Sequence, residues 1–239
     1  MKKTVSVIIP AYKEEKSIEE VISKIIKELE NEINFEIIVI VDKAKDDRTD
    51  EIVGNLSKDF AQIKMILRNG KNGVAKAIED GIKEAKNEII VIAMADGSED
   101  AHELKKIMNK MDEDFDTVYG NRFLNGAGMK NYPGQKYFFN RICNLVIRLI
   151  FKIPSTDITN AAKAYKSEIL KEIKITSKGF EVFAELPIKS YLLGYKNITE
   201  VAIIHDAGMK NTSKFALRKE GIQYVKTVSY THLTLPTKA

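Results

Sequence analysis

Residues 72–100 read NGVAKAIEDGIKEAKNEIIVIAMADGSED and contain two hydrophobic patterns in succession. In the first half, apolar residues recur at intervals of three and four, which predicts an amphipathic helix; these residues are Val74, Ile78, Ile82 and Ala85. The second half contains an apolar run at residues 88–95 that is typical of a strand covered on both faces. A helix that leads directly into a buried strand is a repeating unit of α/β proteins.

The chain on either side of this stretch repeats the alternation. Four more strand-like runs occupy residues 4–9, 35–41, 63–67 and 116–121, and helical patterns separate the first four strands along the chain. One helical stripe begins at Ile18, behind an apparent capping box from Ser17 to Glu20. Such alternation implies right-handed crossovers. The predicted fold is therefore a single α/β domain with a mostly parallel sheet and helices on both faces.

The composition is that of an ordinary globular protein, with 239 residues, 44% hydrophobic and 30% charged. The single cysteine, Cys143, excludes an internal disulfide framework and a Cys-rich metal site. Neither a signal peptide nor a membrane-spanning run of about 18 apolar residues is expected. The net charge is +4, but residues 121–160 contain six bases and one acid. That local excess suits phosphates or an anionic membrane surface, and a solvated loop explains the charge equally well.

Acidic side chains follow two of the predicted strands. Asp42 comes directly after residues 35–41, and Asp96 comes directly after residues 88–95. Parallel sheets bind ligands at the carboxyl ends of their strands, so both carboxylates are expected in one crevice. There they can hold a divalent cation against a diphosphate, or bind a base and a ribose. The alternative for each is a loop acid bonded to backbone N–H groups. Asp100 is different, because Asp100 to Glu103 forms a capping box for the next helix.

Several common catalytic motifs are missing. The glycines of NGKNG match neither a P-loop nor a dinucleotide fingerprint, and Gly70 and Gly73 are each expected to form a plain turn before a helix. There is no HExxH or GxSxG motif. A nucleotidyltransferase, which shares a nucleotide-binding α/β plan, requires a basic, glycine-rich loop after the first strand. The sequence there is PAYKEE, which is acidic and has no glycine.

The second half of the chain contains a strongly apolar helical pattern at residues 137–151. Its polar residues fall every four positions and form one stripe; they are Asn140, Asn144, Arg148 and Lys152. Two placements are open: an interior helix, or a helix in a membrane interface with its basic stripe toward the headgroups. Further strands are expected at 159–165 and 195–204, with a helix between them that Pro187 should kink. Residues 229–239 look like a non-native tail, so the natural sequence is expected to continue past about residue 228.

Five segments in order carry a family resemblance: SVIIPAYKEEKSI, FEIIVIVDKAKDDRTDEI, the stretch 72–100, DTVYGNRF and TDITNAAKAYKSEIL. Together they resemble the family 2 glycosyltransferases of the GT-A fold, and in particular the dolichyl-phosphate mannosyltransferase and undecaprenyl-phosphate sugar transferase branch. The resemblance covers residues 4 to about 205. It implies a GT-A-like domain over residues 1–228, with a nucleotide-binding half at 1–122 and an acceptor half at 123–228.

The resemblance also implies an activity. It is the inverting transfer of a sugar from a nucleoside diphosphate sugar to a polyprenyl phosphate or cell-envelope glycan, with Mg²⁺ or Mn²⁺ and without nucleic acid. The implied location is the cytoplasmic face of a membrane, with peripheral contact through residues 137–151. A non-enzymatic alternative is a degenerate GT-A domain that acts as a binding or scaffold protein.

Motif positions assign the donor-side residues through the same resemblance. The donor-binding residues are Pro10, Ala11, Tyr12, Glu14, Asp42 and Asp96. Two family acids are replaced, by Lys43 and Met94. Asp96 remains as the metal ligand, with the Ser98 hydroxyl as a weak partner, so the cation is expected to bind weakly without the donor.

The acceptor side is assigned in the same way. Arg122, Lys136 and Lys163 fall where the family carries bases near the donor and acceptor phosphates. Lysine offers a point charge where the family often has the bidentate fork of arginine. Asp157 is the first candidate for orienting or deprotonating the acceptor, and Glu181 is the second.

Overall fold

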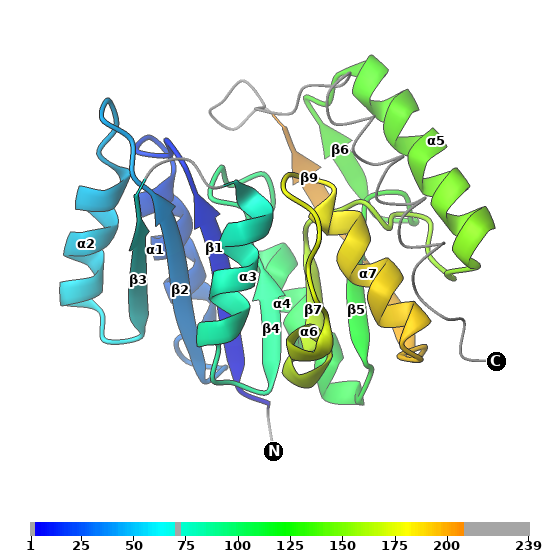
Figure 1. Cartoon of the computed structure of the whole chain (residues 1–239), viewed down its shortest axis with the longest axis horizontal. Helices are drawn as coiled ribbons and strands as arrows, with labels where there is room; N and C mark the ends of the chain where they lie inside the picture. Colours follow the sequence, from blue (N-terminus) through cyan, green and yellow to red (C-terminus); the bar gives the residue numbers. More distant parts are fainter. Residues whose placement is uncertain (1–2, 70–72, 208–239) are drawn as a thin grey trace.

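The computed structural model describes residues 3–69 and 73–207. The expected non-native tail, the domain end at residue 228 and the turn at Gly70 lie outside these residues. A seven-stranded sheet forms the centre of the molecule, in the order β3-β2-β1-β4-β7-β5-β8 (Figure 1). Its strands are β1 (Val5–Ala11), β2 (Phe35–Asp42), β3 (Ile63–Arg68), β4 (Ile89–Ile92), β5 (Thr117–Asn121), β7 (Lys163–Lys166) and β8 (Ile198–Ala202).

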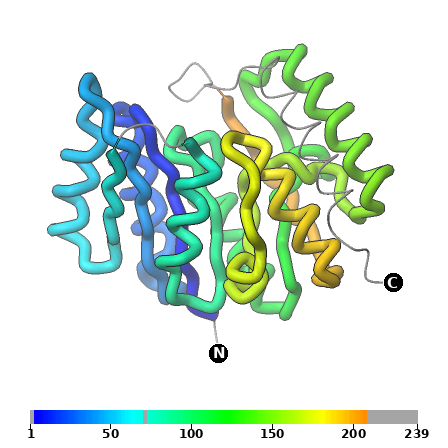
Figure 2. The backbone as a smooth tube through the Cα atoms, viewed as in Figure 1, coloured from blue at the N-terminus to red at the C-terminus, as the bar shows by residue number. Residues whose placement is uncertain are grey.

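The sheet is mostly parallel, as the sequence predicts. Strands β1 to β4 pair in parallel, β7 is antiparallel to both β4 and β5, and β8 is parallel to β5. A second, two-stranded sheet joins β6 (Gly128–Lys130) to β9 (Ile204–Asp206). These two segments are distant in the sequence, yet the orange β9 lies beside the green β6 (Figure 2). The small sheet lies entirely in the expected acceptor half, whereas the large sheet combines β1 to β5 of the first half with β7 and β8 of the second.

Helices cover both faces of the large sheet, which confirms the predicted layers. One apolar core lies under α1 (Ile18–Leu29), α2 (Thr49–Asp59) and α4 (Ala101–Lys110). The other lies under α3 (Val74–Glu84), α6 (Ser167–Glu172) and α7 (Val182–Leu192), together with the end of α5 (Gly134–Phe151). Gly81 allows α3 to approach β1 closely, because a Cβ at this position would lie 2.5 Å from the Ile8 side chain.

Two local predictions about helix starts have different outcomes. Asp100 caps α4, since its carboxylate accepts a hydrogen bond from the His102 N–H at 3.0 Å. Ser17 does not cap α1 with its side chain, so that prediction is wrong. Its hydroxyl instead donates to the Glu14 carboxylate at 3.1 Å, which turns it away from the helix.

Two predictions for the second half are also revised. The strand expected at 159–165 is only Lys163–Lys166, because residues before it form turns held by Asp157 and Asn160. The strand expected at 195–204 is divided into β8 and β9. Helix α7 contains Pro187 and continues across it. Among residues 3–69 and 73–207, no helix is long and apolar enough to cross a membrane.

Candidate donor and acceptor site

Three neighbouring parallel strands bring the expected donor residues to one edge of the sheet. In the register of β1 and β2, Pro10 pairs with Ile40 and Ala11 with Val41, so Asp42 ends β2 beside the end of β1. Strand β4 pairs with β1 on the other side and leads to Asp96. Six of the seven strands run in this direction, so the edge collects the loops that carry most polar candidates.

The loop after β1 is tied to the loop after β2. Glu14 is buried, and its backbone N–H donates to the Thr49 hydroxyl at 2.8 Å. Lys13 has a positive φ of 57° and forms an ion pair with Asp46 at 2.6 Å. Tyr12 is half-buried beside this pair. These contacts hold the end of β1 in a defined conformation.

Asp42 is buried against an arginine that the sequence reasoning missed. Nη2 of Arg68, at the end of β3, lies 2.6 Å from Oδ1 of Asp42, and its Nη1 lies 3.1 Å from Asp80. The neighbouring Lys43 pairs with Asp50 at 3.3 Å. Arg68 is the last residue of β3 and pairs in register with Asp42, the last residue of β2. In the sequence, the position of both residues at the ends of consecutive strands was the signal that could have revealed this contact. A donor base at this edge would therefore meet an arginine–aspartate pair.

The loop after β4 separates the acids that crowd together in the sequence. Asp96 accepts a hydrogen bond at Oδ1 from the Ser98 N–H at 3.0 Å. The Ser98 hydroxyl donates to Glu99 at 3.0 Å, and the other oxygen of Glu99 lies 3.0 Å from Nδ1 of His205 on β9. Burial opposes ionisation of Glu99, yet the hydrogen bond and charge of His205 keep its pKa below the ordinary value. Glu99 and His205 thus form a buried link to β9 that the scattered histidines did not reveal.

The side-chain oxygens of Asp96 and Ser98 fit a hard cation that takes its other ligands from a bound diphosphate. Within the described part of the chain, no group of three or more His, Cys, Asp or Glu side chains could hold a metal ion. Asp96 supplies a carboxylate at the end of β4, and the Ser98 hydroxyl is already bonded to Glu99. Mg²⁺ takes one or two protein carboxylates when substrate phosphates complete its coordination. The side chains therefore suit a site that depends on a diphosphate.

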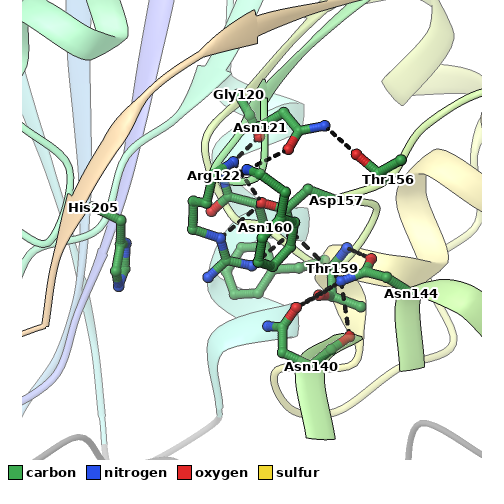
Figure 3. A network of polar contacts seen from close by, with 12 residues as sticks. Gly120, Asn121, Arg122, Asn140, Asn144, Thr156, Asp157, Thr159, Asn160 and His205 are labelled. Carbon is green, nitrogen blue, oxygen red and sulfur yellow. Dashed lines mark hydrogen bonds and ion pairs between the residues drawn. The ribbon is translucent and has the colours of Figure 1, made fainter. Parts of the chain in front are cut away.

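Arg122 and Asp157 form a buried bidentate ion pair. Nε and Nη2 of Arg122 each lie 2.7 Å from a different oxygen of Asp157, and the Arg122 N–H donates to the same carboxylate at 2.9 Å. The side chains are 5% and 0% exposed, so water does not screen the pair. Burial alone would lower the pKa of Arg122, but the charge and hydrogen bonds of Asp157 raise it above the ordinary value. Figure 3 shows this pair inside a wider polar network, with His205 standing apart from it.

Lys163 lies between the ends of β4 and β5. It begins the antiparallel strand β7 and pairs in register with Ile92 and with Tyr119, so it reaches the same edge as the carboxyl ends of the parallel strands. Its amine donates to the Asn160 carbonyl and lies 5.4 Å from the centre of the Tyr119 ring. Burial lowers the pKa of Lys163 to about 7, although the charge of Asp157 opposes that shift. A cation that is only partly charged at neutral pH is thus held at the site.

Two other candidates lie at helix starts. Lys136 is half-buried in the first turn of α5, and burial lowers its pKa. Glu181 precedes α7, and its Oε1 accepts hydrogen bonds from the N–H groups of Lys178 and Gly179 at 2.9 and 3.0 Å. Its Oε2 is buried and has no hydrogen-bond partner among the described residues. One oxygen of Glu181 therefore closes its own loop, and the other is a buried acceptor without a partner within the described ranges.

Comparison with known proteins decides the family. The family described as "Glycosyl transferase family 2" matches residues 6–174. The chain belongs to this family. A dolichol-phosphate mannosyltransferase of Pyrococcus furiosus is 29% identical over 212 residues, which cover 88% of this chain and 58% of the relative. An undecaprenyl-phosphate mannosyltransferase of Micrococcus luteus is 26% identical and is matched over 82% of this chain and 81% of its own length.

The fold has solved counterparts as well. Glucosyl-3-phosphoglycerate synthase from Mycobacterium tuberculosis, crystallised with Mn²⁺, UDP and phosphoglyceric acid, superposes with a TM-score of 0.72. At 18% identity, the match covers 99% of this chain and 80% of that one. This likeness confirms the GT-A fold, and the relatives confirm the expected family 2 branch. The chain spans 58% of the length of the Pyrococcus relative.

This family 2 glycosyltransferase should become more stable relative to Lys163→Met as the pH is raised from 7 to 9. The pKa of Lys163 is about 7 in the folded protein and 10.5 for an ordinary lysine, so between these values the unfolded chain binds a proton that the folded chain does not. The free energy of unfolding then rises with pH by up to about 1.4 kcal/mol per unit. Urea denaturation of both proteins at pH 7, 8 and 9 measures the difference. Parallel pH profiles would contradict the prediction.

Proposed function

We propose that this chain transfers a sugar, with inversion, from a nucleoside diphosphate sugar to a polyprenyl phosphate. The observation that carries the proposal is the meeting of two charge types at one sheet edge. Asp42 ends β2 and Asp96 lies in the loop after β4, on the two sides of β1, and Lys163 reaches the same edge from β7. Carboxylates suit a ribose and a cation, whereas buried cations suit the phosphates of donor and acceptor. The named relatives in this family support a lipid-phosphate acceptor.

On the donor side, each residue has a role in this proposal. Pro10 and Ala11 shape the end of β1, while Tyr12 and Glu14 border the nucleotide. Asp42 contacts the base or ribose from its pair with Arg68. Asp96, with Ser98 as a weaker oxygen, would hold a divalent cation, which when bound neutralises charge on the donor diphosphate. A cation is supported by the similar fold of glucosyl-3-phosphoglycerate synthase, which was crystallised with Mn²⁺ and with Mg²⁺.

On the acceptor side, the buried bases stabilise charge. An acceptor phosphate is already ionised at neutral pH and needs no strong base before its oxygen attacks the anomeric carbon. Arg122, Lys136 and Lys163 attract that phosphate and stabilise the leaving diphosphate. Asp157 is fully buried against Arg122, so its proposed role is to orient this guanidinium. Glu181 is the alternative contact to an acceptor, through its Oε2, which has no partner among the described residues and is buried unless the loop before α7 moves.

A thermal-shift screen tests donor binding directly. We expect UDP-, GDP- or dTDP-sugars to raise the melting temperature, and Mn²⁺ to increase that shift while having little effect alone. A ligand at about 100 times its dissociation constant adds about 2.7 kcal/mol to the free energy of unfolding. A tight response to Mn²⁺ alone would contradict the donor-dependent cation site. The absence of any shift would favour the scaffold alternative, which Lys43 and Met94 motivate.

Helix α5 supplies the proposed membrane contact. The structure shows that α5 is not an interior helix, because it exposes a row of large apolar side chains: Phe138, Ile142, Leu145 and Leu149. Phe138 and Leu149 are each 68% exposed. By helical periodicity, the exposed Arg141 and Arg148 lie along one flank of this row. An apolar row with a basic flank suits an anionic bilayer surface, and we propose that surface as its occupant, at the cytoplasmic face of the cell membrane.

The expected basic stripe is only partly correct. Asn144 of that stripe faces the protein and is 2% exposed, whereas Arg148 is exposed. The apolar row, with arginines beside it, replaces the stripe as the lipid-facing surface. The polar residues of the expected stripe lie on two sides of α5, because Asn144 turns inward to form hydrogen bonds with Thr159 in the loop that follows the helix.

Replacing both Phe138 and Leu149 with glutamate should reduce binding to phosphatidylglycerol vesicles at least about tenfold, since burying one such side chain contributes about 1.5–3 kcal/mol. Vesicle co-sedimentation at fixed salt measures the change. Phe60→Glu is a matched control, because Phe60 is a 37% exposed aromatic residue at the end of α2. Equal binding by the double variant and the control would overturn the membrane proposal.

A further inference from the structure

Asn144 is a buried polar residue on the inner side of α5. It is 2% exposed, although much of the opposite side of the helix is apolar and open to solvent. Its Oδ1 accepts a hydrogen bond from the Thr159 N–H at 3.0 Å, and its Nδ2 donates to the Thr159 hydroxyl at 3.0 Å. Both ends of one amide thus hold one residue of the loop between α5 and β7.

The same amide approaches the partner of Arg122. Nδ2 of Asn144 lies 3.5 Å from Oδ1 of Asp157, the oxygen that accepts the 2.7 Å hydrogen bond from Nη2 of Arg122. Nδ2 also donates to Oδ1 of Asn140 one turn earlier at 2.6 Å. Asn140, Asn144 and Thr159 are grouped beside Asp157 in Figure 3. An N–H group next to a buried carboxylate stabilises its charge and limits its movement.

We propose that Asn144 is a positioning residue that fixes Asp157 and, through it, the guanidinium of Arg122. Helix α5 thereby sets the orientation of a base at the phosphate end of the site. The inference rests on the proposed function only for the role of Arg122 in catalysis. Because the other side of α5 carries the proposed lipid-facing row, one helix joins that surface to the site.

The first test needs no enzymatic activity. In Asn144→Ala, exchange of the Arg122 Nε–H with solvent, followed by NMR of the full chain, should be several-fold faster, because Asp157 loses the N–H dipole 3.5 Å away and the loop loses its hold at Thr159. Asn144→Asp should accelerate exchange at least as much, since it keeps an acceptor for the Thr159 N–H but replaces the N–H beside Asp157 with a second carboxylate that repels it. The matched control is Ile147→Ala, which loosens the inner side of the same helix at a 2% exposed residue outside the polar network.

An equal acceleration in Ile147→Ala would show that general loosening of α5 is responsible and would overturn the inference. Unchanged exchange in both Asn144 variants would overturn it too. The assay gives an answer even if no nucleotide sugar is a substrate. Failure of the proposed function and failure of this inference are therefore distinguishable.

The second test uses kinetics in a double-mutant cycle. Asn144→Ala should lower kcat about tenfold while KM for the donor stays within about twofold, because the orientation of Arg122 matters most in the transition state. In an Asp157→Asn background, the same substitution should have less than about a twofold further effect. Independent, multiplying effects would mean that Asn144 does not act through Asp157.

Discussion

Asp157→Asn is expected to lower the free energy of unfolding by about 3–5 kcal/mol, because removing one partner of a buried ion pair leaves the other charge uncompensated. Arg122 is 5% exposed, and the Asp157 carboxylate accepts hydrogen bonds from its Nε–H, its Nη2–H and its backbone N–H. Asparagine retains one oxygen acceptor but no charge. The buried guanidinium would then lack a counterion.

Urea denaturation at pH 7 measures this loss. Glu84→Gln is the control, because Glu84 forms an exposed ion pair with Lys64 that solvent screens, so its loss should leave stability nearly unchanged. The double variant Arg122→Met/Asp157→Leu should recover much of the stability, since it removes both charges from the interior. A loss below about 1 kcal/mol in Asp157→Asn would mean that water or another group compensates Arg122.

Asp96→Ala should lower sugar transfer at least about 100-fold, comparable with the removal of one electrostatic contact to the transition state. Asp96 is the acid that the family resemblance leaves in this loop, beside Met94, and it lies four residues past the end of the central strand β4. In the proposed function it would hold the cation that neutralises charge on the donor diphosphate. The effect should appear both in transfer to a polyprenyl phosphate and in slow hydrolysis of the donor.

Asp100→Ala is the matched control, because Asp100 is an acid of the same loop whose carboxylate caps α4. It should lose about 1 kcal/mol of stability, as expected for a lost N-cap, and retain its activity below the unfolding transition. Release of nucleoside diphosphate, measured with saturating donor and Mn²⁺, compares the variants. Equal activity of Asp96→Ala and the wild type would contradict the assignment. An inactive wild-type protein that still binds nucleotide sugars would identify a scaffold.

The layered architecture could be predicted because it depends on local patterns. Apolar runs such as residues 88–95 can be buried on both faces only within a covered sheet, and the helical stripes supply the covering layers. The collinear motifs then indicated the family, which the family match confirms. The capping role of Asp100 was predicted correctly, since a helix cap is determined by residues within four positions.

Interactions between distant segments could not be predicted in the same way. Arg68 contacts Asp42 from the neighbouring strand, and His205 contacts Glu99 across 106 positions. No spacing rule connects such residues, because a partner depends on strand order and on the paths of the loops. The error at Ser17 has the same origin, since its hydroxyl found a closer acceptor in the folded loop.

The sequence by itself determined the α/β layers, the family and the edge of the sheet where polar residues collect, because hydrophobic period and motif order act locally along the chain. Only the tertiary structure decided which charges are paired. Asp157 was a candidate base in sequence, but packing places it against Arg122 with no exposed surface. The apolar helix was open to two placements, and the fold turns Asn144 inward and Phe138 and Leu149 outward. Burial and pairing are properties of segments that meet in space, so they appear only once the chain has folded.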